Sequence, residues 1–238
     1  MKAADELVTL AAGPLRLVLN PALGGSIARF DHVRHGRSVP VLRDCEPQQS
    51  VLEAASFPLV PYVNRIRDGA FRFRGRTVRL EPNMAGDPSP LHGQGWLNPW
   101  RVLSVSAQEA VLEYEHPAGE WPWAYVARQH FKLDDGALDV ALSCRNLADE
   151  PMPCGLGQHP YFHCSEGTRL QTKVDHAWTI DDPTVARHTR RVVMMRDGRV
   201  VENTLTGRAL DPSTSSGSSR ASSRDPSRAA SRDRSHRP

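Results

Sequence analysis

The chain has 238 residues, of which 39% are hydrophobic and 24% charged, enough for one or two globular domains with a sizeable core. Its formal net charge is +3, but residues 211–238 hold six Arg and three Asp, so residues 1–210 carry equal numbers of basic and acidic side chains. A neutral body has no electrostatic footprint for nucleic acid or for an anionic membrane surface, and neither partner is expected for it.

The N-terminal stretch MKAADELVTLAAGPLRLVLN reads neither as a signal peptide nor as a membrane span, because Gly13, Pro14 and Arg16 interrupt its apolar residues. The four cysteines form no CxxC pair: Cys45, Cys144, Cys154 and Cys164. Such sparse use fits reduced thiols better than a disulfide framework. Together these features predict a cytoplasmic protein.

The body is dominated by apolar residues with a period of two, which indicates strands. A short helical piece is expected at residues 50–56, followed by a hairpin over residues 71–80 with its turn at Gly75. A second hairpin is predicted over residues 125–144 around Asp135-Gly136, and a third over residues 191–201 around Asp197-Gly198. Many short strands without βαβ alternation predict an all-β fold, a large antiparallel β-sandwich.

Three motifs are not explained by strand patterning alone. In PLVPYVNRIRDG, the amide of Asn64 and the guanidinium of Arg65 can grip vicinal hydroxyls from two directions. In PLHGQGWLNPW, His92 precedes two glycines that let the backbone approach a ligand closely. Taken singly, each has a plain structural reading, as a solvated strand end and as a loop histidine beside a packed tryptophan.

The third motif is GLGQHPYFHC, in which His159 is followed by Pro160 and two aromatic residues. The proline fixes the backbone after the histidine, and aromatic rings offer a flat surface for a sugar ring. His163 stands four residues further on, a spacing that also suits zinc on a helix, but Pro160 disfavours such a helix. We therefore expect no metal site, and a purely structural histidine remains an alternative.

The chain resembles the aldose 1-epimerase (galactose mutarotase) family from about Asn20 to about Leu210. The resemblance rests on three motifs in this order and spacing: NRI with a following FRF hairpin, HGxGW, and GxGxHPYF. The resemblance implies a galactose mutarotase-like sandwich with a sugar cleft on one sheet. It also implies interconversion of the α and β anomers of an aldohexose by acid–base ring opening. The substrate is then a small-molecule sugar, and the reaction requires no cofactor.

The resemblance also implies roles for individual residues. His159 matches the general acid that acts on the ring oxygen, and histidine suits this because its ordinary pKa is about 6.5. His92 matches the second histidine, which hydrogen-bonds the ring oxygen or a neighbouring hydroxyl. Asn64 and Arg65 match the substrate-gripping pair. Asp211 in RALDP begins the family's sugar-binding aspartate motif, which the next two residues do not continue.

The family's general base is a glutamate further downstream, whereas residues 211–238 contain ten serines and no Glu. They also hold no Val, Ile, Leu, Met, Phe, Tyr or Trp, so we expect a disordered tail there, produced by a frameshift or rearrangement. Residues 1–210 would then form an incomplete, C-terminally truncated sandwich with impaired activity. Two alternatives stay open: a non-catalytic sugar-binding sandwich, and RNA binding by the Arg/Ser-rich tail. The preferred aldose or sugar phosphate and the oligomeric state are not predicted.

Overall fold

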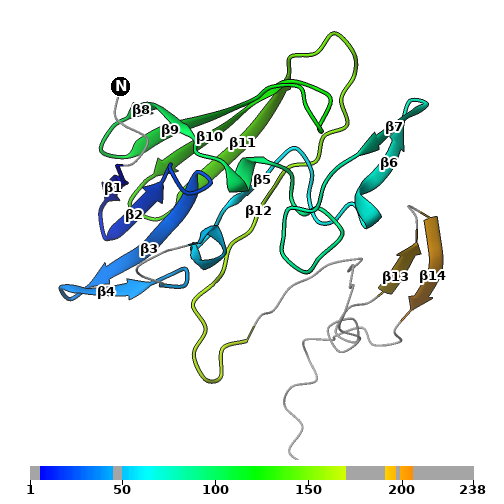
Figure 1. Ribbon diagram of the computed structural model, residues 1–238. Coiled ribbons are helices and arrows are strands. Elements are labelled where there is room, and N and C mark those ends of the chain that lie inside the picture. The colour runs from blue at the N-terminus through cyan, green and yellow to red at the C-terminus, as the bar shows by residue number, and fades with distance from the viewer. Residues whose placement is uncertain (1–5, 45–49, 170–190, 197–198, 206–238) are drawn as a thin grey trace, which may run out of the picture. The chain divides into compact units, whose positions relative to one another are not determined.

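The computed structural model describes residues 6–44, 50–169, 191–196 and 199–205. It divides into two compact units, Met1–Arg169 and Leu170–Pro238. The strands of the first unit are β1 (Val8–Ala12), β2 (Leu15–Asn20), β3 (Ser26–Arg34), β4 (Arg37–Pro40), β5 (Pro58–Leu59), β6 (Ala70–Phe73), β7 (Arg76–Arg79), β8 (Arg101–Val105), β9 (Glu109–His116), β10 (Tyr125–Leu133), β11 (Leu138–Asn146) and β12 (Gly157–Gln158) (Figure 1). The second unit contributes β13 (Arg191–Arg196) and β14 (Arg199–Leu205).

Helical structure in the described residues is confined to three 3₁₀ turns: Val51–Glu53, Arg67–Gly69 and Gly95–Leu97. The first lies within the predicted helical piece, and Ser50 and Glu53 close it with a reciprocal capping box. No helix among the described residues has the length and apolar composition needed to cross a membrane. The fold is all-β, as predicted.

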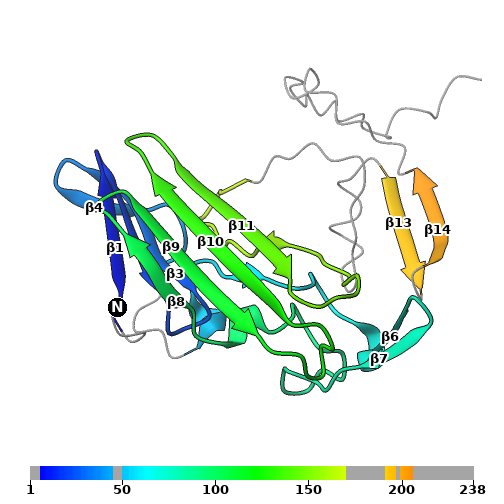
Figure 2. The ribbon, with the colours of Figure 1, turned by 90° about the horizontal axis from the view of Figure 1, so that it is seen from above.

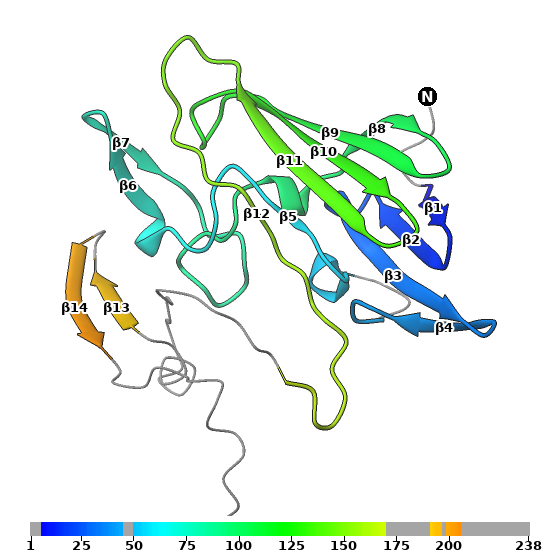
Figure 3. The same ribbon diagram turned by 180° about the vertical axis from the view of Figure 1, so that it is seen from behind.

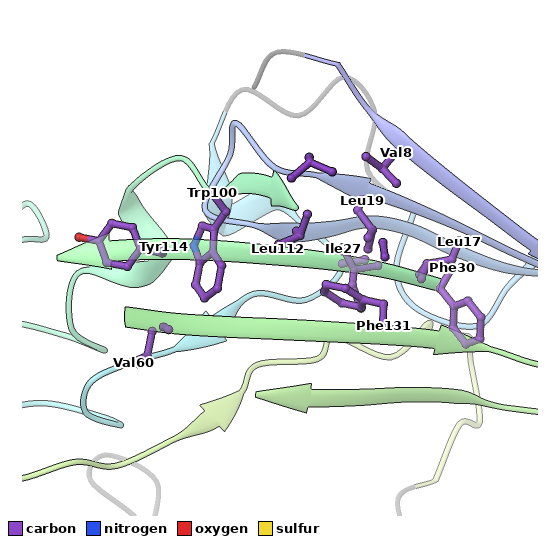
Figure 4. Close-up of a cluster of buried hydrophobic side chains, with 14 of the residues drawn as sticks. Val8, Leu17, Leu19, Ile27, Phe30, Val60, Trp100, Leu112, Tyr114 and Phe131 are labelled. Carbon is purple, nitrogen blue, oxygen red and sulfur yellow. The ribbon is translucent and has the colours of Figure 1, made fainter. Parts of the chain in front are cut away.

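Two four-stranded sheets form the body of the first unit, in the orders β1-β2-β3-β4 and β11-β10-β9-β8. All neighbouring strands in both sheets are antiparallel. Figure 2 shows the two sheets as separate layers, and Figure 4 shows side chains of both layers meeting between them. The predicted antiparallel sandwich is therefore confirmed.

Alternation along the strands builds the core between these layers. Leu17 and Leu19 from the first sheet and Leu112 and Phe131 from the second are fully buried (Figure 4). Leu10 of the first sheet is fully buried as well. Burying one such side chain contributes about 1.5–3 kcal/mol to stability. The sandwich thus provides a rigid base for the loops at its edge.

The predicted hairpins are present, with one refinement of turn chemistry. In the first, β6 pairs with β7 and the chain turns through Arg74 and Gly75, both at positive φ. In the second, Asp134 rather than Gly136 organises the turn, because its Oδ1 accepts from the N–H groups of Gly136 and Ala137. In the third, the described strands β13 and β14 pair antiparallel, while residues 197–198 lie outside the described residues.

A two-stranded ladder, β5 with β12, crosses the middle of the first unit (Figure 3). It pairs Gly157 with Leu59 and Gln158 with Pro58. This ladder brings together two segments that are about a hundred residues apart in sequence. One precedes Asn64 and the other precedes His159. The predicted tail, residues 211–238, and Asp211 with it lie outside the described residues.

Candidate functional site

The structure brings His92 and His159 together beside the β5–β12 ladder. Their ring centroids lie 5.5 Å apart at an interplanar angle of 73°. Phe57, at the start of the ladder, stacks on His159 with 4.8 Å between centroids and lies 6.4 Å from His92. The HGxGW and HPYF motifs, far apart in sequence, therefore share one site.

His92 is fixed by a reciprocal pair of hydrogen bonds to Asn64. The His92 backbone N–H donates to the Asn64 carbonyl at 3.0 Å, and the Asn64 backbone N–H donates to His92 Nδ1 at 3.0 Å. Because Nδ1 accepts, the proton of the neutral ring resides on Nε2. Burial, assisted by the nearby His159 and Arg65, lowers the pKa of His92 to about 4. At neutral pH, His92 is an uncharged, fixed donor through Nε2.

The glycines of HGQGW serve packing against the β5 segment. Gly93 has φ +75°, and a Cβ there would lie 2.2 Å from the Val60 carbonyl oxygen. Gly95 donates its N–H to the same oxygen at 3.1 Å, and a Cβ there would meet the Val60 side chain at 2.3 Å. The sequence predicts that these glycines make room for a ligand, whereas in the structure they make room for Val60. Trp96 Nε1 holds the loop from inside by donating to the carbonyls of Leu91 and Gly93, each at 3.0 Å.

His159 is half-buried and packs against two aromatic rings, which lie 6.2 Å from each other. Its backbone N–H donates to the Phe57 carbonyl at 3.0 Å, and its ring lies 4.8 Å from those of both Phe57 and Tyr161. Burial, with the charge of Arg43, holds the pKa of His159 below its ordinary value. Nδ1 is buried and has no hydrogen-bond partner among the described residues. Proton exchange with a ligand therefore falls to Nε2.

Arg43 supports this histidine and has no motif that marks it in the sequence. Its guanidinium lies 3.6 Å from the centre of the Tyr161 ring, and its backbone N–H donates to the Tyr161 carbonyl at 2.7 Å. The guanidinium also donates to the carbonyls of Ala54, at 2.7 and 3.0 Å, and of Leu52. Arg43 thus ties the HPYF segment to the turn before Phe57.

Asn64 and Arg65 are both exposed. Arg65 Nε donates to Asp87 Oδ2 at 2.5 Å, and this bond holds the pKa of Asp87 below its usual range. Asp87 belongs to residues 82–88, which line an open hollow of about 610 Å³. The Arg65 guanidinium is therefore oriented by a carboxylate that sequence reasoning missed.

His163, the residue at zinc-like spacing from His159, does not join the site. His163 is exposed and lies in irregular backbone after Pro160, not on a helix with His159. The described residues contain no group of three or more His, Cys, Asp or Glu side chains that could hold a metal ion. Asp211 is outside the described residues.

Several solved structures with similar folds are described as aldose 1-epimerases or mutarotase-like proteins. A crystal structure of an Escherichia coli K12 protein, provisionally described as an aldose 1-epimerase, matches with a TM-score of 0.61 at 37% identity, over 67% of this chain and 53% of that one. A galactose mutarotase-like protein from Clostridium acetobutylicum matches with a TM-score of 0.56 at 21% identity, over 67% and 52%. A galactose mutarotase related enzyme from Lactobacillus acidophilus gives 0.59 at 17% identity, over 84% and 62%. The fold is thus that of the galactose mutarotase-like sandwiches.

The sequence comparisons place the chain more narrowly. The sequence model of the aldose 1-epimerase family matches residues 6–236, continuing past Leu210, where the motif resemblance ends. The chain belongs to the aldose 1-epimerase family. It is 37% identical over 172 residues to the uncharacterized protein YphB of Escherichia coli K12, covering 72% of this chain and 57% of YphB. It is 22% identical over 197 residues to the uncharacterized protein YihR, spanning 62% of that protein.

Proposed function

We propose that this chain interconverts the α and β anomers of a free aldohexose such as galactose. The observation that carries the proposal is the pair of imidazoles 5.5 Å apart, one held as a neutral donor and the other with a single nitrogen left for proton exchange. The rings of Phe57 and Tyr161 beside them supply apolar surface of the kind that sugar rings lie against.

The reaction breaks the bond between C1 and the ring oxygen O5, rotates about C1–C2 and closes the ring on the other face. A base takes the proton of the C1 hydroxyl as an acid gives one to O5, and the roles reverse on closure. We assign the acid to His159 through Nε2. His92 donates a hydrogen bond from Nε2 to O5 or an adjacent hydroxyl, Asn64 and Arg65 grip further hydroxyls, and Asp211 would bind another.

The base is a group other than the two histidines. His92 cannot accept the proton at neutral pH, because its Nδ1 is occupied by the Asn64 N–H and its pKa is about 4. Glu113 is buried and bound by Arg128, at 2.6 Å, and by Arg101. We propose that turnover is about 10² to 10⁴ times slower than with a positioned glutamate if no such residue fills the role.

Polarimetry tests the proposed activity directly. Freshly dissolved α-galactose or α-glucose relaxes slowly to its anomeric equilibrium in buffer, and the full chain should accelerate this relaxation in proportion to protein concentration. If the relaxation rate equals that in buffer at protein concentrations that bind the sugar, the proposed mutarotase activity is rejected.

A non-catalytic sugar-binding protein is the second candidate. It is favoured because Glu113 is paired with two arginines and His92 Nδ1 accepts from Asn64, so neither of these two residues serves as the base while the binding groups stay in place. Isothermal titration with galactose separates the candidates: heat of binding without faster mutarotation identifies a binder.

A further inference from the structure

One polar side chain interrupts the apolar stripe of β10. Tyr125, Ala127, Phe131 and Leu133 are buried on the core face, and Gln129 stands among them with 1% of its surface exposed. A buried amide is costly unless its hydrogen bonds are made, so its partners show what it holds in place.

Gln129 is the middle link of an amide relay, defined here as Gly25, Gln129, Gln158 and Ser56. Gln129 Nε2 donates to the Gly25 carbonyl at 2.8 Å. Gln158 Nε2 donates to Gln129 Oε1 at 3.0 Å, and the Ser56 hydroxyl donates to Gln158 Oε1 at 3.4 Å. The relay runs from the turn before β3, through the core, to the β5–β12 ladder.

The orientation of each amide follows from one fixed acceptor. The Gly25 carbonyl can only accept, so Gln129 must present Nε2 to it and Oε1 to the other side. Gln158 must then present Nε2 to Gln129, which leaves its Oε1 for the Ser56 hydroxyl. All three bonds point the same way, an arrangement in which each bond polarises the next.

The relay reaches β12 at Gln158, the residue before His159. β12 has only two residues, but backbone pairing continues on both sides of it, where the N–H groups of Gly155 and His159 donate to the carbonyls of Pro61 at 2.7 Å and of Phe57 at 3.0 Å. Neighbouring side chains of extended backbone point to opposite faces, so a slip of one residue would exchange Gln158 and His159. The Gln158 amide, hydrogen-bonded in the core, therefore adds a side-chain anchor to the backbone pairing that sets which face His159 presents.

We propose that Gln129 and Gln158 are positioning residues, which hold His159 against Phe57 and beside His92 through the amide relay. The hydrogen bonds of the two amides go to the relay and not to the imidazole. They act by anchoring β12 to the core alongside its backbone hydrogen bonds, so removing either should loosen the imidazole ring. As a role in catalysis this inference rests on the proposed mutarotase function, but as a statement about the placement of His159 it does not.

The test uses the full chain with Gln129→Leu and Gln158→Leu, which remove the amide with little change of volume. Phe131→Leu, on the same core stripe and outside the relay, is the matched control for lost stability. The first readout is NMR titration of the His159 imidazole, identified by the signal that His159→Gln removes. A loosened ring gains solvent, so its pKa should rise toward the ordinary value of about 6.5 in both relay variants and stay as in wild type in Phe131→Leu.

The second readout is mutarotation. We expect kcat to fall about 10- to 100-fold in each relay variant with KM little changed, because a misplaced acid costs rate rather than sugar affinity. The double variant should be no worse than the poorer single one, since both act through one relay. If Gln129→Leu fails to fold, the partly buried Gln158→Leu decides. An unchanged His159 titration in Gln158→Leu would overturn the proposal that the amide relay positions His159. An inactive wild-type protein would reject only the proposed mutarotase activity.

Discussion

At the scale of single residues, the burial of His92 is compatible with the donor role proposed for it. With 8% of its surface exposed the ring favours the neutral form, and the donor role needs the proton on Nε2, where it lies because Nδ1 accepts from the Asn64 N–H. The donor role of His92 could be anticipated from the HGxGW motif. The position of its proton on Nε2 could not, because the Asn64 N–H reaches Nδ1 only after the chain has folded.

The depressed pKa of His92 predicts a loss of stability in mild acid. The unfolded histidine binds a proton below about pH 6.5 and the folded one only below about pH 4, so protons favour the unfolded chain between these values. The free energy of unfolding should fall across this window by at most about 3 kcal/mol from this group.

Urea denaturation at several pH values measures this loss. His92→Asn is the comparison, because its side-chain oxygen can still accept from the Asn64 N–H but does not titrate. The pH dependence should be smaller in His92→Asn than in wild type across the window. Identical pH dependence of the two proteins would show that His92 does not carry the effect.

At the scale of elements, the sequence predicts regular structure well and the loops between strands poorly. The FRFRGR hairpin and the alternation of β10 and β11 follow from period two and from turn residues within a few positions. The β5–β12 ladder cannot be read in this way, because it has two residues a strand and joins segments about a hundred residues apart. The signals available were Gln129 in an apolar stripe and Gln158 beside His159, but no local pattern pairs them.

The HGQGW loop gives a prediction at this scale. Gly93→Ala should destabilise the protein by about 2–4 kcal/mol, because it adds a Cβ against the Val60 carbonyl and requires a positive φ. Thermal denaturation measures the loss, and it should be accompanied by weaker sugar binding as His92 moves.

Gly119→Ala is the control for Gly93→Ala. A Cβ at Gly119 meets nothing within 4 Å. It should leave the melting temperature within about one or two degrees of wild type. Equal effects of the two substitutions would show that the HGQGW loop does not need its glycine.

At the scale of the whole molecule, the sandwich of the first unit is the platform on which the site is built. Its two layers share one core, so deletion of a central side chain should be felt throughout this unit. Leu112→Ala, at a fully buried position of β9, should lower the free energy of unfolding by about 2–5 kcal/mol. Leu103→Ala, with 41% of the leucine exposed on β8, should change it by less than about 1 kcal/mol.

Chemical denaturation followed by tryptophan fluorescence compares the two leucine variants. Trp96, Trp100, Trp121 and Trp123 are all buried in this unit and should report one transition. Similar losses in both variants would contradict a core centred between the layers.

The assignment of His159 as the acid is tested most directly by polarimetry on freshly dissolved α-galactose with paired histidine variants. His159→Gln should reduce the protein-dependent rate by about 10²- to 10⁴-fold, because the proton donor to O5 is lost. His163→Gln, in the same motif but exposed, should keep the wild-type rate. A wild-type rate in His159→Gln would contradict the assignment of the acid.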